Sequence, residues 1–344
     1  ASHFLIYLLV GVQLFRKIKK PLKRIFSFLL LFLLSCAPIS IYNSNEFQMD
    51  SFWGFLMIGL FFLAFINYYR YKKVFPGILL FLSSAFIGFG KNEWSVMLIS
   101  SCILILLLYV IIQRFVKKEK FDILFIKIMI ITIVGNVLGN LINYLLDPQM
   151  YISGINLIVK MVTVGTMSGA PNTVAWFDVF LVRIPFISTC ILLIFLILLF
   201  IWQYRKKLNY YYLFLFIYSF SLFFAFFISS WGNYSRYFAP SLIGLIYVFL
   251  LYFTSYKVNK ANVVAIIIAM LVTGFLGYKQ IEDFRIQSKN SEYFNIPKDS
   301  SPSCIPLIDV GRVYKNKDID FIHLSIGYVA AQEIADDFNK EVCK

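Results

Sequence analysis

Charged residues are scarce in this sequence. They make up 15% of its 344 residues, whereas a soluble domain has about 25%. They are also clustered, so that long uncharged stretches lie between them. Hydrophobic residues make up 60% of the chain, and the mean hydropathy is +0.77. This balance argues against a soluble globular enzyme and is typical of a protein that lies in a lipid bilayer.

Histidine, cysteine and the motifs of soluble enzymes are also few or missing. The two histidines, His3 and His323, are too isolated to form a metal site. The sequence has no phosphate-binding glycine loop, no Cys/His cluster and no nucleophile elbow. Of the five cysteines, Cys304 and Cys343 lie in the more polar C-terminal part. These two cysteines can form a disulfide if the tail lies in an oxidising compartment, but their spacing in the sequence alone does not decide whether they meet.

Ten uncharged stretches have about the length of a membrane span. A helix needs about 20 apolar residues to cross ~30 Å of hydrocarbon. The stretches are 1–15, 25–45, 51–69, 74–90, 94–113, 128–146, 184–204, 208–235, 237–256 and 261–278. We therefore predict an all-α polytopic membrane protein, with about ten transmembrane helices in residues 1–278. Residues 279–344 contain polar turn residues and alternating segments, and they are predicted to form a small mixed α/β tail.

The basic residues are concentrated in every second connector between the predicted spans, as expected if those connectors lie on one side of a membrane. The net charge of +14 would by itself suggest a nucleic-acid partner. However, alternate connectors hold 19 of the 23 Lys and Arg residues in 1–278. These connectors are 16–24, 70–73, 114–127, 205–207 and 257–260. Their alternation follows the positive-inside rule, so we predict that they are cytoplasmic and expect no nucleic-acid partner.

The same rule predicts that the start of the chain and its tail are extracytoplasmic. The chain begins inside an apolar run without an initiator Met, so we expect upstream sequence in the natural protein. Lys outnumbers Arg by 23 to 9, and the 38 Phe and 22 Tyr residues are many. This composition hints at an AT-rich bacterial genome and therefore at the bacterial inner membrane.

Polar groups at the outer ends of the predicted spans are the candidate site residues. Arginine presents a planar fork of donors that matches phosphate oxygens, and lysine supplies a compact charge. Such groups suit an anionic lipid head group. The alternatives are a polar turn at 91–93 and an aromatic interface belt with a snorkelling arginine at 231–237. The candidate substrate-binding residues are Lys91, Asn92, Glu93, Tyr234, Arg236 and Tyr237.

Three segments at outer helix ends carry a further pattern. Residues 34–38 and 44–50 read LSCAP and SNEFQMD, residues 90–92 read GKN, and residues 235–240 read SRYFAP. In this order they resemble the "LSP…SRxxxxD" segment, the "TKG"-like turn and the "RYxLP" stretch of one superfamily. That superfamily contains the protein mannosyltransferases and the lipid A aminoarabinose transferases. The resemblance covers roughly residues 1–255.

The resemblance implies a GT-C fold and a glycosyltransferase. Such an enzyme moves a sugar from a polyprenyl-phosphate donor to an extracytoplasmic acceptor, which is a glycan, a lipid or a protein. By this resemblance Lys91 and Arg236 contact the lipid phosphate, and Asp50 is the acidic residue at the start of its span. Glu46 is a further carboxylate candidate. Carboxylates here would act as a base or hold a divalent metal such as Mg or Mn.

The chain departs from the superfamily at several positions. Asn45 stands where the superfamily has Arg, Gly90 where it has Thr, and Asn92 where it has Gly. The main catalytic acid of the superfamily lies in a first outer loop that would precede this chain, so no residue here inherits that role.

Three other functions fit the composition. An O-antigen-type polymerase or a flippase for lipid-linked sugars also has many spans and outer arginines. A transporter would favour charges or broken helices near mid-span, often with internal repeats, and the predicted spans carry no charge away from their ends. A structural membrane subunit is the last alternative.

Overall fold

The structure is a computed structural model of the chain. It describes residues 2–16, 18–35, 49–117, 120–164, 176–205, 209–228 and 239–257, and residues 263–278 apart from 270, 273, 276 and 277. The predicted α/β tail, with Cys304 and Cys343, lies outside the described residues. The described helices all belong to one compact unit, Ala1–Gln280.

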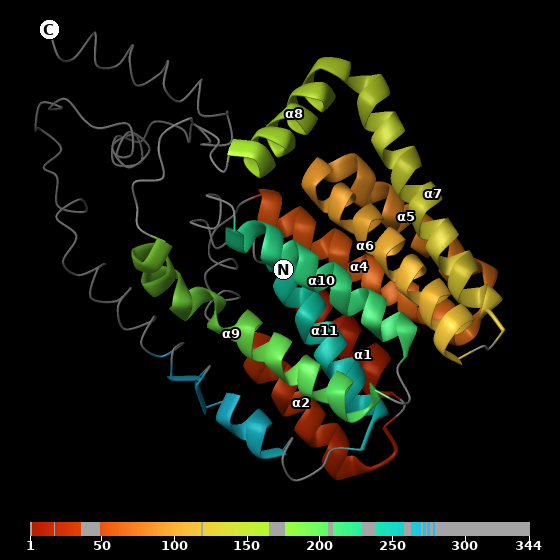
Figure 1. Ribbon diagram of the computed structural model, residues 1–344. Helices are drawn as coiled ribbons and strands as arrows, with labels where there is room; N and C mark the ends of the chain where they lie inside the picture. Colours follow the sequence, from red (N-terminus) through yellow and green to blue (C-terminus); the bar gives the residue numbers. More distant parts are fainter. Residues whose placement is uncertain are drawn as a thin grey trace, which may run out of the picture. The chain divides into compact units, whose positions relative to one another are not determined.

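Every regular element in the described part of the chain is a helix (Figure 1). This confirms the predicted all-helical fold of that part. The helices are α1 (Ser2–Phe15), α2 (Pro21–Ser35), α4 (Met49–Tyr71), α5 (Val74–Gly90), α6 (Asn92–Ile111), η1 (Ile112–Lys117), α7 (Ile123–Leu146), α8 (Pro148–Val164), α9 (Trp176–Gln203), α10 (Tyr210–Ile228) and α11 (Ala239–Ser255).

Two of these helices meet the length and hydropathy of a membrane span. They cover Asn92–Phe115 and Ile123–Leu146, and among the residues searched six shorter apolar helices accompany them. Large apolar side chains on these two spans are exposed, such as Leu107 at 57% and Ile130 at 53%. Polar side chains such as Thr132 are instead buried. An exposed apolar surface around buried polar groups is the reverse of what a soluble protein presents to water.

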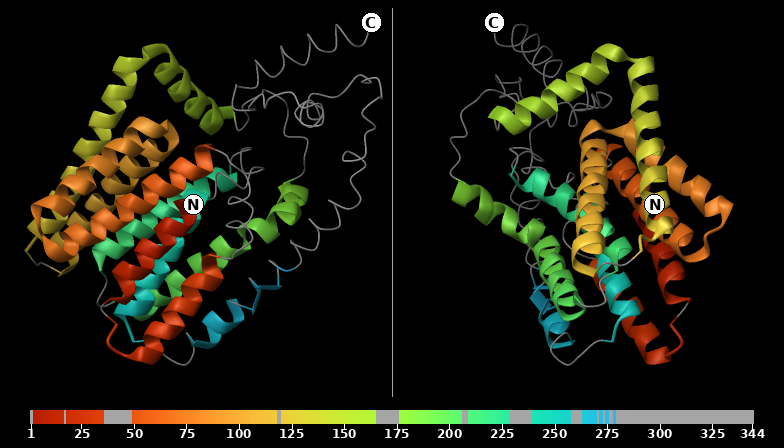
Figure 2. Two further views of the ribbon diagram at one scale, coloured as in Figure 1. Left: turned by 180° about the vertical axis from the view of Figure 1, so that it is seen from behind. Right: turned by 45° about the vertical axis from the view of Figure 1, so that its right-hand side comes forward.

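Small residues bring α5 and α7 close together. A Cβ on Gly139 of α7 would overlap the backbone carbonyl of Ala85 in α5. Gly135 lies one turn earlier and meets the carbonyl of Phe81 in the same way. Helices that pack through small residues four apart approach more closely than larger side chains permit. In both views of Figure 2, α5 and α7 lie side by side.

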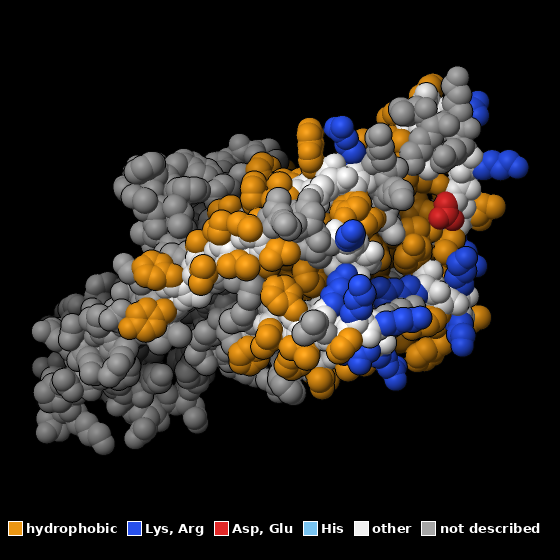
Figure 3. Space-filling view, turned by 90° about the horizontal axis from the view of Figure 1, so that it is seen from below, with side chains coloured by type: hydrophobic (Ala, Val, Ile, Leu, Met, Phe, Trp, Pro, Cys, Tyr) orange, Lys and Arg blue, Asp and Glu red, His pale blue; other side chains and the backbone are white. Residues whose placement is uncertain are grey.

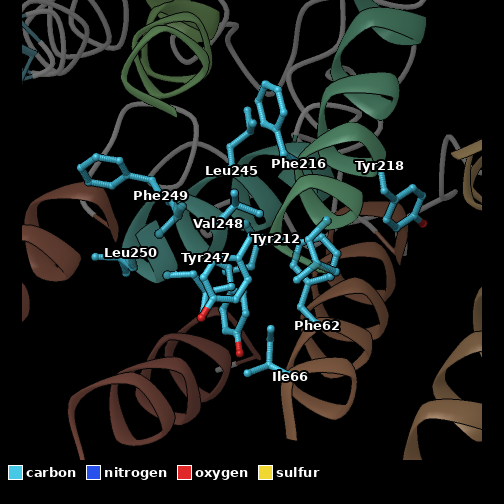
Figure 4. Packing of buried hydrophobic residues seen from close by; sticks show 14 of the residues in the cluster. Phe62, Ile66, Tyr212, Phe216, Tyr218, Leu245, Tyr247, Val248, Phe249 and Leu250 are labelled. Atoms are coloured by element: carbon cyan, nitrogen blue, oxygen red, sulfur yellow. The ribbon is translucent and has the colours of Figure 1, made fainter. Parts of the chain in front are cut away.

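Aromatic side chains fill the contact between α4, α10 and α11. Phe62 of α4 lies 6.1 Å from the ring of Tyr218 in α10 and 5.8 Å from the ring of Tyr247 in α11 (Figure 4). Phe65 stacks on Phe214 at 5.1 Å. Each such pair stabilises the fold by about 0.5–1.5 kcal/mol beyond the area it buries. These contacts hold together helices that lie far apart in the sequence.

Helix α8 covers one end of α7. Asp147 separates the two helices, and its carboxylate accepts a hydrogen bond from the backbone N–H of Met150 at 2.9 Å. An acidic residue that accepts from the first turn is a favourable N-cap. The chain therefore turns sharply at Asp147, and α8 runs across the end of α7 (Figures 1 and 2).

The described parts of the five basic connectors lie at one end of the helices. Hydrogen bonds join residues that lie within or beside neighbouring connectors. The bonds run from Lys23 Nζ to Tyr256 O, from Tyr204 Oη to Lys257 O, from Asn209 Nδ2 to Tyr69 Oη, and from Tyr211 Oη to Asp122 Oδ2. We call this the basic end; it runs along the bottom and the lower right of Figure 1.

Candidate functional site

The predicted site residues lie at the start of α4, between α5 and α6, and in the segment before α11. Asp50 is the second residue of α4, and its side chain is not described. Glu46, Tyr234, Arg236 and Tyr237 lie outside the described residues. The connector Lys91–Glu93 is described in full, so the geometry of the site is built from it.

Lys91 is the single residue between α5 and α6. Its backbone is extended, with φ −151° and ψ 129°, and its N–H donates to the carbonyl of Ile87. One residue therefore ends α5 and begins α6. Its ammonium lies 5.5 Å from the centroid of the Trp94 ring, within reach of a cation–π interaction. This contact holds a half-buried positive charge beside the start of α6.

Asn92 and Glu93 begin α6. The Nδ2 of Asn92 donates to the carbonyl of Tyr151 in α8 at 3.5 Å. The Oδ1 of Asn92 is buried without a hydrogen-bond partner, which is costly for a polar atom. Glu93 places a half-buried carboxylate in the first turn of α6, where the helix dipole favours negative charge. The connector thus presents a cation, an anion and an unused acceptor.

Trp94 joins three helices directly below this connector. Its side chain is only 3% exposed. A Cβ on Gly54 of α4 would lie 2.5 Å from Cη2 of Trp94 and 2.8 Å from Cγ of Pro240 in α11. Gly54 therefore packs against both Trp94 and Pro240, so that α4, α6 and α11 meet at this glycine. The Nε1 of Trp94 is also buried without a partner.

The residues of this contact lie within or shortly after the three segments that carry the resemblance. Gly54 lies four residues, about one helical turn, after Asp50. Trp94 directly follows Lys91–Glu93, and Pro240 is the last residue of segment 235–240. The side chains of Asp50 and Arg236 are not described, but α4, which contains Asp50, and α11, which begins after Arg236, meet α6 at Gly54. The sequence alone did not identify Trp94 as a site residue.

A hydrogen-bonded network supports the same end of the helices. Ser95 Oγ donates to Asn136 Oδ1 at 2.6 Å, and Asn140 Nδ2 donates to Ser95 Oγ at 2.6 Å. Tyr151 Oη of α8 donates to Asn140 Oδ1 at 3.3 Å. The network joins α6, α7 and α8, and fully satisfied buried networks rigidify the structure around them. The signal in the sequence was the pair Asn136 and Asn140, one turn apart in an apolar run.

The described residues do not form a metal site. No group of three or more His, Cys, Asp or Glu side chains among them is close enough to hold an ion. At the connector Glu93 is a single described carboxylate, whereas a divalent cation such as Mg²⁺ takes several oxygen ligands.

No family model, no curated protein and no solved structure matches this chain.

Proposed function

We propose that this protein is a polytopic membrane glycosyltransferase of the bacterial inner membrane. It moves a sugar from a polyprenyl-phosphate donor to an extracytoplasmic acceptor. The observation that carries this proposal is the contact of Gly54, Trp94 and Pro240. This contact joins helices α4, α6 and α11 at residues that lie within or shortly after the three segments that resemble the transferase superfamily.

The surface of the helices supports the membrane part of the proposal. Two helices have the length and composition of spans, and exposed apolar side chains continue along α5, α6 and α7. The basic connectors gather at one end. About ten spans with that end in the cytoplasm satisfy the positive-inside rule. Lys91 then faces the extracytoplasmic side, where a lipid-linked sugar donor is used.

The proposed reaction is a displacement at the anomeric carbon of the sugar. The oxygen of the acceptor hydroxyl forms a bond to this carbon, and the bond from the carbon to the lipid-phosphate oxygen breaks. The hydroxyl proton passes to a carboxylate base, and the electron pair of the broken bond stays on the lipid phosphate. Lys91 and Arg236 stabilise this growing negative charge. Asp50 and Glu46 are the proposed carboxylates in this chain.

The other candidate residues bind the donor. Asn92 offers its unused buried acceptor to a sugar hydroxyl, and Glu93 accepts from a second hydroxyl. Tyr234 and Tyr237 supply aromatic surface and hydroxyl groups beside Arg236.

Sugar transfer in membranes that contain the full-length natural protein tests the proposal. The donor is a labelled polyprenyl-phosphate sugar, and the variants are Lys91→Ala and the control Lys120→Ala. Lys120 is an exposed lysine of the connector 114–127, at the basic end. We expect Lys91→Ala to lower the transfer rate on the order of 10²-fold and Lys120→Ala to leave it unchanged. Equal rates in all three proteins would contradict the role of Lys91.

The donor itself separates the alternatives. If no polyprenyl-phosphate sugar supports transfer, the glycosyltransferase proposal is wrong. Membranes that extend a lipid-linked glycan, or move one across the bilayer, would then identify a polymerase or a flippase.

A further inference from the structure

A cavity opens at the basic end, far from the proposed transfer site. Its volume is about 390 Å³. It lies where the connector between α1 and α2 meets the ends of α4 and α11. The described residues that line it are Leu14, Ile18, Lys19, Lys20, Lys23, Arg70, Thr254 and Ser255.

Four of these lining residues are basic, and no described lining residue is acidic. Lys19 and Lys20 are exposed, and Lys23 and Arg70 are half-buried. Burial lowers the pKa of the Lys23 ammonium, and the charge of Lys20 lowers it further. The charge of Lys20 therefore disfavours the charged form of Lys23, and an anion in the cavity would offset this repulsion.

Hydrogen bonds from basic side chains to backbone carbonyls hold the walls of the cavity in place. Lys23 Nζ donates to the carbonyls of Thr254 and Tyr256 at 3.2 Å each, which ties α2 to the end of α11. Arg24 donates from Nε and Nη2 to the carbonyl of Ile18 at 3.1 and 2.6 Å, which fixes the connector. A cavity supported in this way does not need to form around its ligand, so less ordering opposes binding.

Exposed apolar side chains lie on α1 and α2, the two helices whose connector lines the cavity. Leu8 and Val12 of α1 are exposed, and so are Ile25 and Phe28 of α2. In the view of Figure 3, the largest group of Lys and Arg side chains has hydrophobic side chains beside it, and other Lys and Arg side chains stand apart from it. A positive pocket beside an apolar surface matches a ligand with an anionic head and hydrocarbon chains.

We propose that this cavity binds the phosphate of an anionic phospholipid in the cytoplasmic leaflet. Basic pockets between membrane helices on the cytoplasmic side bind lipids of this class. The four basic residues surround the phosphate, and the acyl chains follow the exposed faces of α1 and α2. The inference rests on the membrane orientation given above, but not on sugar transfer.

The test compares lipids and soluble phosphates on the purified full-length protein in a neutral detergent. The probes are cardiolipin, phosphatidylglycerol, phosphatidylcholine, inorganic phosphate and pyrophosphate, and bound lipid is counted by native mass spectrometry and titrated. We expect cardiolipin and phosphatidylglycerol to bind and phosphatidylcholine not to. The pocket variant is Lys20→Gln with Arg70→Gln, which leaves the structural Lys23 unchanged. Its affinity for cardiolipin should fall roughly 25-fold, since each of the two basic residues near a lipid surface contributes about a factor of five.

The control variant removes two charges elsewhere on the basic end. Arg114 and Lys120 are exposed and do not line the cavity, so Arg114→Gln with Lys120→Gln should retain the affinity of the natural protein. Equal losses in both double variants would reduce the effect to general surface charge and overturn the proposal. Binding of pyrophosphate or phosphate without binding of either lipid would also overturn it, because the ligand would then be a soluble anion. Lipid binding is read without any sugar donor, so its failure and that of sugar transfer are distinguishable.

Discussion

Gly54 lies at the meeting point of α4, α6 and α11, where a methyl group has no room. A Cβ there would lie 2.5 Å from Cη2 and 2.6 Å from Cζ2 of Trp94, and 2.8 Å from Cγ of Pro240. Because protein interiors are close-packed, Gly54→Ala must displace one of these rings or the helix itself. Trp94→Phe removes both Cη2 and Cζ2, whereas the contact between residue 54 and Pro240 stays. The two substitutions together therefore form a double-mutant cycle on one contact.

The expected coupling follows from the size of the overlap. Overpacking of this kind lowers the free energy of unfolding by about 1–3 kcal/mol. Alanine is favoured over glycine inside a helix by about 0.8–1.0 kcal/mol, so the net loss for Gly54→Ala is roughly 0–2 kcal/mol. The helix preference is the same in both backgrounds and cancels in the cycle. We expect a coupling of about 1–2 kcal/mol, with Gly54→Ala less harmful when Trp94 is Phe.

The assay is reversible unfolding of the four purified proteins in one detergent, followed by far-UV circular dichroism. This signal does not depend on the indole that the cycle removes. A second cycle with Gly90→Ala in place of Gly54→Ala is the control, since a Cβ on Gly90 meets nothing within 4 Å, and it should show no coupling. If Gly54→Ala costs the same in both backgrounds, to about 0.5 kcal/mol, the contact is absent. The proposed transfer site would then lose the observation on which it rests.

Two further substitutions test the packing around the site by the same unfolding assay. Gly139→Ala should lower the free energy of unfolding by about 2 kcal/mol, because the added methyl overlaps the backbone of Ala85, which cannot rotate away. Gly90→Ala should change it little, and equal effects would mean that α5 and α7 are less tightly packed. Ser95→Ala should cost about 1–2 kcal/mol, since it removes the hydroxyl that joins α6 to α7. The exposed Ser100 is the control, and an equally small effect at both serines would contradict the network.

The helices were largely predictable because they follow the uncharged runs. The stretch 74–90 coincides with α5, and the stretch 51–69 lies within α4. The ends were less predictable. Helix α7 begins at Ile123 rather than 128, because Asp122 caps it by accepting from the N–H of Leu124. Helix α9 begins at Trp176 rather than at 184. Residues 176–183 were expected on a connector and are instead part of the helix. A helix that starts at a capping residue can include charged residues, and a search for uncharged runs misses that part of the helix.

The candidate site was predictable only as separate pieces. The connector Lys91–Glu93 follows from charged residues between two apolar runs, which require a turn at a helix end. Trp94 had no signal of its own, because a tryptophan at the start of an apolar run is equally suited to lipid contact. The cavity at the basic end was also hidden. The connectors 16–24 and 70–73 read only as topology signals until the structure brought Lys20 and Arg70 to one cavity.

By itself the sequence determined the local properties of this protein. Runs of apolar residues favour helices of span length, and clustered charges interrupt them, since both effects act between near neighbours in the chain. Only the tertiary structure decided which helix ends meet. The contact of Gly54, Trp94 and Pro240, and the cavity between α1, α2, α4 and α11, depend on side-chain volumes and hydrogen bonds from distant segments. Packing of this kind is a property of the whole fold, and no single segment encodes it.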